Sequence, residues 1–352
     1  MKIGIIGRVA VGAKLIDGQT IKTKILLSEL KANYSDSEYF IVDSHNSKKK
    51  IYSYIINVMR CIKKCDVIFI LLSSNGIKVT FPIVYLINKI YKKIIIHDVI
   101  GGRLDEVAKE NRIILRSIKS FYVNLVESKE LENKLKKIGI NNVEVVPNFK
   151  RIKCVNESSI KKHESMPFTF CTFSRVSKSK GIGEAIKAIK QINSEAGFRK
   201  VTLDIYGPIE DAYKDEFLTI LNDNYEAINY NGCVDYDKSV DILKNYYGLL
   251  FPTTFFGEGF PGTVIDAFSA ALPVIATNWH CNPEIINDYE TGLLYNYDEP
   301  EMLVEKIKEY IQLPEKVYEM KCNCIREARK YDADIIMKRI IDIINQSTKG
   351  KK

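Results

Sequence analysis

Short apolar runs alternate with amphipathic segments along almost the whole of this chain, and the alternation limits the folds that it can adopt. Uninterrupted apolar runs of this length are typical of strands that are buried on both faces. The segments between them repeat their apolar residues with the period of a helix. The pattern therefore predicts an α/β fold of parallel sheets covered by helices. The predicted strands lie at residues 2–6, 39–42, 67–72, 93–97, 120–126 and 143–146, and again at 168–173, 201–205, 228–231, 248–251, 273–276 and 292–295.

The alternation pauses once, at the polar residues 148–167, which end at Pro167. A chain of 352 residues is long enough for two domains of ordinary size. We therefore predict two Rossmann-like, doubly wound domains that face a cleft, with a C-terminal helix that crosses back to the first domain. The predicted divisions are an N-terminal domain at 1–150, a linker at 151–167, a second domain at 168–330, and the C-terminal helix with its basic tail at 331–352.

The charge of the chain is unevenly distributed. Residues 1–150 hold 26 Lys and Arg against 14 Asp and Glu, whereas the whole chain has a net charge of +8. This excess favours an anionic partner or surface, although an ordinary lysine-rich, solvated surface explains it equally well. The eight cysteines lack the paired spacing of a zinc site, and no apolar stretch is long enough to span a bilayer. We expect a cytoplasmic protein without a metal or a nucleic-acid partner, and we hypothesise peripheral contact with the inner face of the cell membrane.

The most informative segment is FFGEGFPGTVIDAF at residues 255–268, where a strand leads through a glycine-rich loop into a helix. Gly259 and Gly262 allow a ligand to approach the backbone closely, and the start of the helix presents N–H groups that suit a diphosphate. Thr263 could add a hydroxyl donor, and Glu258 and Asp266 could contact different ends of one ligand. The alternative is a purely structural junction in which Glu258 caps the helix and Asp266 is only an acidic residue of its first turn.

This segment resembles the E-x7-E signature of glycosyltransferase family 4, a family of retaining enzymes with the GT-B fold. The continuation is also similar to that family, with ALPVIAT at 271–277, NPEII at 282–286 and ETGLL at 290–294. The resemblance implies that Glu258 orients the transferred sugar and that Asp266 binds the ribose of the donor. It also implies donor contacts from Gly259, Phe260, Gly262, Thr263 and Val264. The sequence departs from the family at Asp266, where Glu is usual, and at Pro261, which has no N–H to donate.

A second match is FSRVSKSKGI at residues 173–182, which resembles the basic pattern that follows the first strand of the family's second domain. Arg175 and Lys180 take the places of its two cations, which can neutralise a departing diphosphate. The alternative is a basic turn on an ordinary surface. Two further segments, around Gly207 and at Gly232 with Val234, resemble the parts of the family site that approach the donor and read its base through the backbone.

In the first half of the chain, His97 ends a predicted strand at a position that, by resemblance, contacts the transferred sugar. A lone histidine of this kind is otherwise a structural residue of the core. Arg103 could hold an anionic acceptor. Gly18, Gln19 and Thr20 are the nearest match to the family's glycine-rich acceptor loop, although this segment could equally cap the helix that follows it.

Together these features predict a metal-independent, retaining glycosyltransferase that uses a nucleotide sugar, with a UDP-sugar favoured and a GDP-sugar as the alternative. By resemblance, the acceptor is a saccharide or a lipid-linked saccharide in the synthesis of bacterial capsule, other surface polysaccharide or glycolipid. A hydrolase is disfavoured because both carboxylates come from one loop–helix unit. An NAD-dependent oxidoreductase is disfavoured because G-x-G-x-x-G does not follow the first strand. A non-catalytic protein that binds sugar nucleotides or docks on membranes remains the alternative from another class.

Overall fold

The computed structural model describes residues 1–10, 12, 17–45, 47–160, 165–221, 226–235 and 237–349. The chain forms two compact units: Met1–Lys150 together with Ala333–Lys352, and Arg151–Asp332. Each unit contains one six-stranded sheet whose paired strands all run parallel. The α/β fold expected from the alternating pattern is therefore confirmed.

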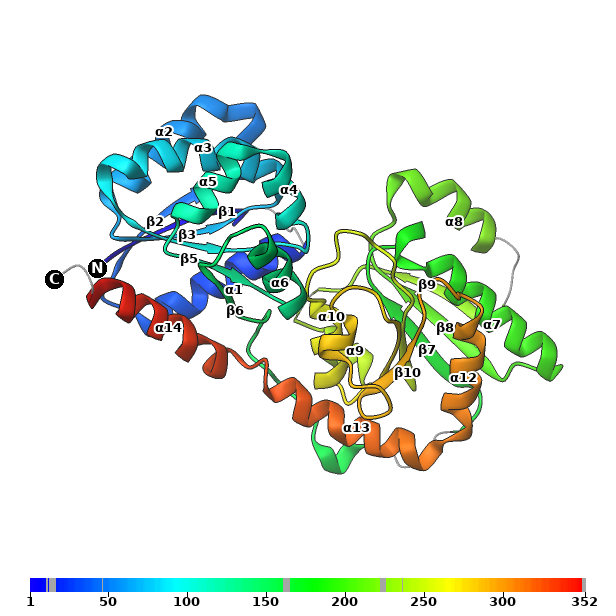
Figure 1. The fold of residues 1–352 in the computed structure, drawn as a ribbon. Coiled ribbons are helices and arrows are strands. Elements are labelled where there is room, and N and C mark those ends of the chain that lie inside the picture. The colour runs from blue at the N-terminus through cyan, green and yellow to red at the C-terminus, as the bar shows by residue number, and fades with distance from the viewer. Residues whose placement is uncertain are drawn as a thin grey trace. The chain divides into compact units, whose positions relative to one another are not determined.

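The first unit has the strand order β2-β1-β3-β4-β5-β6 (Figure 1). Its central strands β1, β3 and β4 are mostly apolar and buried, so both faces of the sheet need helices to exclude water. One face packs against α2, α3, α5 and α6, and the other against α1 and the C-terminal helix α14. The bounds are β1 Lys2–Gly7, β2 Glu38–Asp43, β3 Val67–Leu71, β4 Ile94–Asp98, β5 Val123–Val126, β6 Val143–Val145, α1 Gly18–Asn33, α2 Ile51–Lys64, α3 Ser74–Tyr91, α4 Leu104–Glu110, α5 Arg112–Ser120, α6 Lys129–Lys137 and α14 Ala333–Lys349.

The second unit has the strand order β12-β11-β10-β7-β8-β9 (Figure 1). Helices α7, α8 and α12 cover one face of its sheet, and α9, α10 and α13 cover the other. The bounds are β7 Phe168–Phe173, β8 Val201–Tyr206, β9 Ile228–Gly232, β10 Gly248–Phe251, β11 Val274–Thr277, β12 Gly292–Tyr295, α7 Ile182–Ala196, α8 Lys214–Leu221, α9 Ser239–Leu243, α10 Gly262–Ser269, α11 Asn282–Ile285, α12 Met302–Gln312 and α13 Pro314–Arg329.

The two ends of the second unit lie beside each other. The segment expected to be a linker begins within this unit, because the backbone N–H of Ile152 donates to the carboxylate of Asp332, 2.9 Å away, and that of Val155 donates to the carbonyl of Ser269. Residues 161–164 of that segment and the basic tail at 350–352 lie outside the described residues. Helix α14 belongs to the first unit, as the predicted return of the chain requires.

No helix among the described residues is long and apolar enough to cross a membrane.

In each sheet the strand order reverses once. In the second unit the chain moves outward from β7 through β8 to β9, and then returns to the other side of β7 with β10. Loops that follow the carboxyl ends of strands at such a switch point diverge to opposite faces, and ligands of open α/β sheets bind between them. The ends of β7 and β10 are therefore the first place to look for a site in this unit.

Candidate active site

A largely buried ion pair joins the loops that follow β7 and β10. The ammonium of Lys180 contacts the carboxylate of Glu258, and these two side chains are only 14% and 11% exposed. The hydroxyl of Thr253 donates to the same carboxylate oxygen, Oε2, at 3.0 Å. The Lys180 ammonium also lies 5.5 Å from the ring centroid of Phe251 and 5.1 Å from that of Phe255. The cation predicted from one motif and the carboxylate predicted from another therefore form one centre.

The backbone around Lys180 explains why a glycine follows it. Gly181 has a φ of +69°, which favours glycine, and a Cβ at this position would lie 2.1 Å from the carbonyl oxygen of Pro252. This close approach seats the loop of Lys180 on the end of β10. The backbone N–H of Thr254 then donates to the carbonyl of Ser179 at 2.8 Å, which ties the two loops together.

Arg175, the second predicted cation, lies on the exposed start of the same loop. No ion pair to Arg175 occurs among the residues that the structure describes. Its place depends on Gly207, whose φ is +133° and whose missing side chain lets the backbone approach Ser174: a Cβ there would lie 1.8 Å from the Ser174 oxygen. Arg175 is therefore an exposed cation on the loop that also carries Lys180.

Helix α10 begins at Gly262, and its first turn supplies fewer free donors than its sequence suggests. The hydroxyl of Thr263 donates its proton to the carbonyl of Phe173 at 2.8 Å, so it does not offer that proton to a ligand. The N–H of Val264 donates to the carbonyl of Pro261 at 3.0 Å. The N–H groups of Gly262 and Thr263 precede the first intrahelical i→i−4 bond and are the better placed donors for an anion.

The other predicted donor-site residues near α10 differ in accessibility. Asp266 lies one turn into the helix and is 8% exposed. Phe260 packs its ring 5.2 Å from that of Tyr331, within the core between α10 and α13, so its side chain points away from solvent. The Cys281 thiol donates a hydrogen bond to the carbonyl oxygen of Gly259, 2.7 Å away. Of the family-derived contacts, that of the Phe260 side chain is the least compatible with this arrangement.

The loops after β8 and β9 lie on the other side of β7. The N–H of Gly207 donates to the carbonyl of Gly232 at 2.8 Å, and the Tyr230 hydroxyl donates to the carbonyl of Gly207 at 2.9 Å. Gly232 has a φ of +72° with open space where a Cβ would lie, and Val234 is half-buried beside it. No side chain therefore covers the backbone on the Cβ side of Gly232 in the described structure.

His97 lies in the first unit, and its imidazole is wholly buried. The ring packs edge-on against Phe81 with 4.8 Å between centroids, and it lies 6.0 Å from Phe121. Its Nδ1 lies 3.0 Å from Oδ1 of Asn124, whose amide nitrogen donates to two backbone carbonyls. Nδ1 therefore carries the proton, as assigned from this network. Burial lowers the pKa of His97 to about 4, so the ring is neutral near pH 7.

In this arrangement a sugar reaches His97 only if the surrounding side chains move. The structure gives His97 the environment of a core histidine, which was the alternative that the sequence left open.

The remaining predicted residues of the first unit make internal contacts. Asp17 caps α1 by accepting from the N–H and the hydroxyl of Thr20, at 3.1 and 2.8 Å. Gln19 donates its amide to the carbonyl of Leu71 at 3.0 Å and is buried. Gly18 is exposed, and Arg103 pairs with Glu106 on the next turn, 2.8 Å away. Thr20 therefore takes part in the cap of α1 and Gln19 bonds to the end of β3, while Gly18 and Arg103 lie at the surface.

A second buried charge cluster was not anticipated. The ammonium of Lys22 on α1 lies 2.6 Å from Asp98, at the end of β4, and 2.8 Å from Glu127, just after β5. It also donates to the carbonyl of Val99 at 3.1 Å. Burial opposes its charge, but the two carboxylates outweigh burial and raise the pKa of Lys22. The cluster ties the loops after β4 and β5 to α1. The sequence offers no local signal for it, because Asp98 and Glu127 lie 76 and 105 positions from Lys22.

Thr253 and Phe255 are also missing from the sequence-based site. Their position in the sequence could have indicated a role in the site. Both residues follow the carboxyl end of a buried strand, which is where α/β proteins bind ligands. No group of His, Cys, Asp and Glu that could hold a metal ion occurs in the described part of the chain.

Two doubly wound parallel sheets, one of them with a cation–carboxylate centre at its switch point, define the class: the fold is GT-B. HepE of Anabaena, solved in complex with UDP, has the same fold, with a TM-score of 0.77 and 15% identity over 98% of this chain and 100% of that chain. The model of the family described as "Glycosyl transferases group 1" matches residues 155–331, which include both motifs of the site. The chain belongs to this family.

Two curated relatives are similar in sequence to part of this chain, over part of their own length. An uncharacterised glycosyltransferase of Methanocaldococcus jannaschii is 25% identical over 56% of this chain and 48% of its own length. An uncharacterised protein from the cps region of Klebsiella pneumoniae is 28% identical over 56% of this chain and 52% of its own. The matched region thus spans about half the length of these relatives.

Proposed function

We propose that this protein is a retaining glycosyltransferase that transfers a sugar from a UDP-sugar to a hydroxyl group of a saccharide or lipid-linked saccharide. The observation that carries the proposal is the largely buried Lys180–Glu258 pair at the switch point of the second sheet. A shielded ammonium and an exposed Arg175 on the same loop suit a diphosphate, since charges interact more strongly where water is excluded. The choice of UDP is supported by HepE, which is solved with UDP and with UDP-glucose.

In the proposed reaction, the diphosphate of the donor takes the place of Glu258 at Lys180. The bond between the anomeric carbon and the diphosphate oxygen breaks, and UDP leaves with the electron pair. Lys180, Arg175 and the N–H groups of Gly262 and Thr263 stabilise the charge that develops on it. The acceptor oxygen bonds to the anomeric carbon from the face that UDP leaves, and its proton passes to a phosphate oxygen of UDP. The anomeric configuration is then retained without a covalent intermediate on the protein.

Glu258, once released from Lys180, is free to accept hydrogen bonds from hydroxyl groups of the sugar. The Thr253 hydroxyl stays hydrogen-bonded to one oxygen of Glu258 and so limits the orientations of this carboxylate. Asp266 is proposed to bind the ribose, and the backbone at Gly232 and Val234 the base. His97 has no assigned step here, because its ring is buried; contact with the sugar stays a prediction.

Calorimetric titration with UDP and with GDP tests the proposal against its two alternatives. We expect UDP to bind and Lys180→Ala to weaken it by about tenfold or more, since a hydrogen bond to a charged group contributes about 1.5–3 kcal/mol. Lys178→Ala is the matched control, because Lys178 lies on the same loop but is 77% exposed. Tighter binding of GDP than of UDP would change the proposed donor to a GDP-sugar. Binding of neither nucleotide would refute the proposal.

Catalysis is tested with a panel of UDP-sugars, scored by slow release of free sugar. A protein that binds UDP but hydrolyses none of them, and transfers to no saccharide acceptor, would be a non-catalytic binding protein of this fold.

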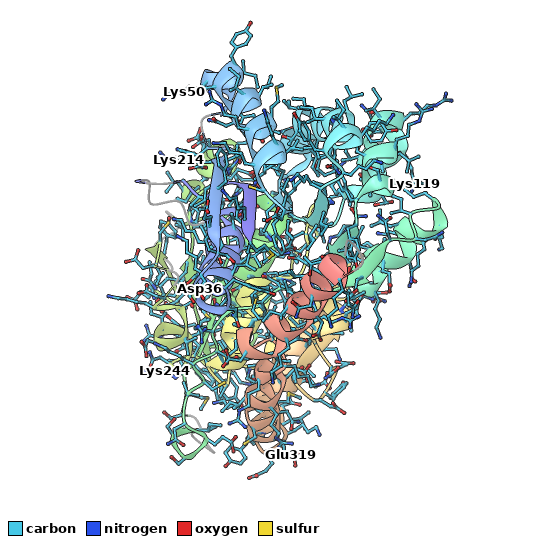
Figure 2. All side chains as sticks on the ribbon, turned by 90° about the vertical axis from the view of Figure 1, so that its left-hand side faces the viewer. Asp36, Lys50, Lys119, Lys214, Lys244 and Glu319 are labelled. Carbon is cyan, nitrogen blue, oxygen red and sulfur yellow. The ribbon has the colours of Figure 1, made fainter. Side chains whose placement is uncertain are left out.

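The place of action is proposed to be the anionic inner face of the cell membrane, in the synthesis of capsule or another surface polysaccharide. The Klebsiella relative comes from a cps region, and a structure similar in fold is that of a lipopolysaccharide outer core galactosyltransferase. Lys50, before α2, and Lys119, at the end of α5, lie on the surface of the basic first unit (Figure 2). Basic segments of this kind are attracted to anionic lipids.

Flotation with vesicles separates this idea from an ordinary solvated surface. We expect the protein to float with vesicles that contain phosphatidylglycerol and not with neutral vesicles, and less so as salt increases. Equal behaviour with both lipids would refute membrane docking and would leave the proposed reaction untouched.

A further inference from the structure

Three exposed aromatic side chains and a half-buried one lie on the loops that follow β10, β11 and β12. Phe255, Phe256 and Tyr297 are 39%, 49% and 47% exposed, and Trp279 is half-exposed. We call this group the aromatic platform. Monomeric proteins seldom expose several large apolar side chains together unless something binds there. The platform lies wholly within the second unit.

The platform is held in place by specific contacts. The indole N–H of Trp279 donates to the carbonyl of Phe255 at 3.0 Å, and the Trp279 ring lies 4.6 Å from that of Tyr297, edge to face. His280 packs edge-on against both Trp279 and Phe256, at 4.5 and 5.9 Å. Its φ of +47° is rare for a residue with a side chain, and such backbone conformations persist where the surroundings impose them, often at functional sites.

Polar side chains border the rings on one side. Asn278 accepts from the backbone N–H of Tyr297 at 3.2 Å and donates to the side chain of Asn296 at 2.9 Å. Asn296 in turn donates to the carboxylate of Glu299 at 3.1 Å. All three are exposed. Amides and carboxylates both form hydrogen bonds with hydroxyl groups.

Aromatic faces beside amides and a carboxylate match the chemistry of a sugar ring. One face of a pyranose presents mainly C–H groups, whose positive edge suits the negative face of an aromatic ring, while its hydroxyl groups point outward around the rim. A lipid chain would not use the polar border, and a purely anionic ligand would not use the rings. The surface therefore favours a neutral saccharide.

The strand order indicates whether this saccharide belongs to the donor or to the acceptor. Neighbouring strands lie about 4.8 Å apart, so the loop after β11 adjoins the loop after β10, on the side away from β8 and β9. Phe255 joins the platform to the Lys180–Glu258 pair, since the Lys180 ammonium lies over its ring. The proposed function places the base of the donor at β8 and β9 and its diphosphate between β7 and β10. The platform then lies beyond the end of the donor that carries the transferred sugar.

We propose that the aromatic platform binds a sugar ring of the acceptor, with Trp279 and Tyr297 against its C–H groups and Asn278 and Asn296 toward its hydroxyl groups. The assignment of this ring to the acceptor rests on the proposed transferase function. Binding of a saccharide to the platform does not.

Trp279 is the only tryptophan of the chain, so its fluorescence reports on this surface alone. The full-length protein is titrated with methyl α- and β-glycosides of glucose, galactose and N-acetylglucosamine, in the absence and presence of UDP. Glycerol, which has hydroxyl groups but no ring, is the control ligand. We expect a saturable change in emission with at least one glycoside and none with glycerol.

Tyr297→Ala keeps the reporter and removes one ring of the platform. We expect it to weaken glycoside binding by about tenfold, while the Kd for UDP changes less than twofold. Phe198→Ala, an aromatic residue that is 53% exposed elsewhere in this unit, is the matched control and should change neither. Circular dichroism confirms that each variant is folded.

Three results would overturn the proposal: no glycoside alters the emission, the response is the same in Tyr297→Ala, or the emission changes only with vesicles or with protein concentration. The last would identify a lipid surface or a second copy as the occupant. UDP calorimetry on the same samples shows separately whether the proposed function stands.

Discussion

Replacing His97 by glutamine tests whether this histidine belongs to the core or to the reaction. Its imidazole is wholly buried between Phe81 and Phe121 and donates from Nδ1 to Asn124. Glutamine retains an amide that can make a similar hydrogen bond but cannot be protonated in the working pH range. The wild type and His97→Gln should therefore differ in how their stability depends on pH.

The size and sign of the effect follow from the pKa of His97. Burial lowers it from 6.5 to about 4 in the folded protein. Between these two values the unfolded chain binds a proton that the folded protein does not, so the free energy of unfolding falls as the pH falls. A shift of one unit is worth about 1.4 kcal/mol, so the whole shift lowers it by about 3 kcal/mol. Above pH 6.5 this group makes no pH-dependent contribution.

The assay is urea unfolding followed by circular dichroism at intervals from pH 7.5 to 4. Other groups titrate in this range, so the quantity of interest is the difference between the wild type and His97→Gln at each pH. We expect the advantage of the wild type to shrink by about 3 kcal/mol on acidification. His45→Gln, which removes a half-buried histidine outside the core, measures what loss of a histidine does in general.

A constant difference across this range would refute the reasoning. So would a histidine NMR signal, assigned through its loss in His97→Gln, that titrates near pH 6.5. Either result would mean that water or a ligand reaches the ring, and the predicted contact between His97 and the sugar would regain its place in the mechanism.

Three other substitutions test the packing on which the site depends. Lys22→Met leaves two buried carboxylates without their cation, and we expect the free energy of unfolding to fall by about 3–5 kcal/mol in chemical denaturation. Gly181→Ala should lower the melting temperature and the affinity for UDP much more than Gly197→Ala does; both have positive φ, but only the first Cβ would strike a backbone carbonyl. Thr253→Val should lower kcat for sugar release at least threefold with UDP affinity nearly unchanged, since the hydroxyl directs Glu258; equal losses in both would refute a positioning role.

Much of the fold is predictable from local pattern. Buried strands such as β3 and β4 are continuous apolar runs, and the segments between them repeat with a helical period, so both sheets and their parallel direction follow from the sequence. The ends of elements are less predictable. The strand expected at 120–126 begins only at Val123, because Phe121 ends helix α5. The loop and helix that carry Glu258 and Asp266 are local, and their spacing could be read directly.

What a side chain touches depends on residues far away in the chain. Lys180 meets Glu258 across 78 positions because β7 and β10 are neighbours in the sheet, and strand order is not written in any single segment. The same holds for Phe260, which turns into the core, and for His97, which Phe81 and Phe121 enclose. A motif states which chemical groups are present, whereas burial and partners come from packing between distant segments, and these decide which groups can meet a ligand.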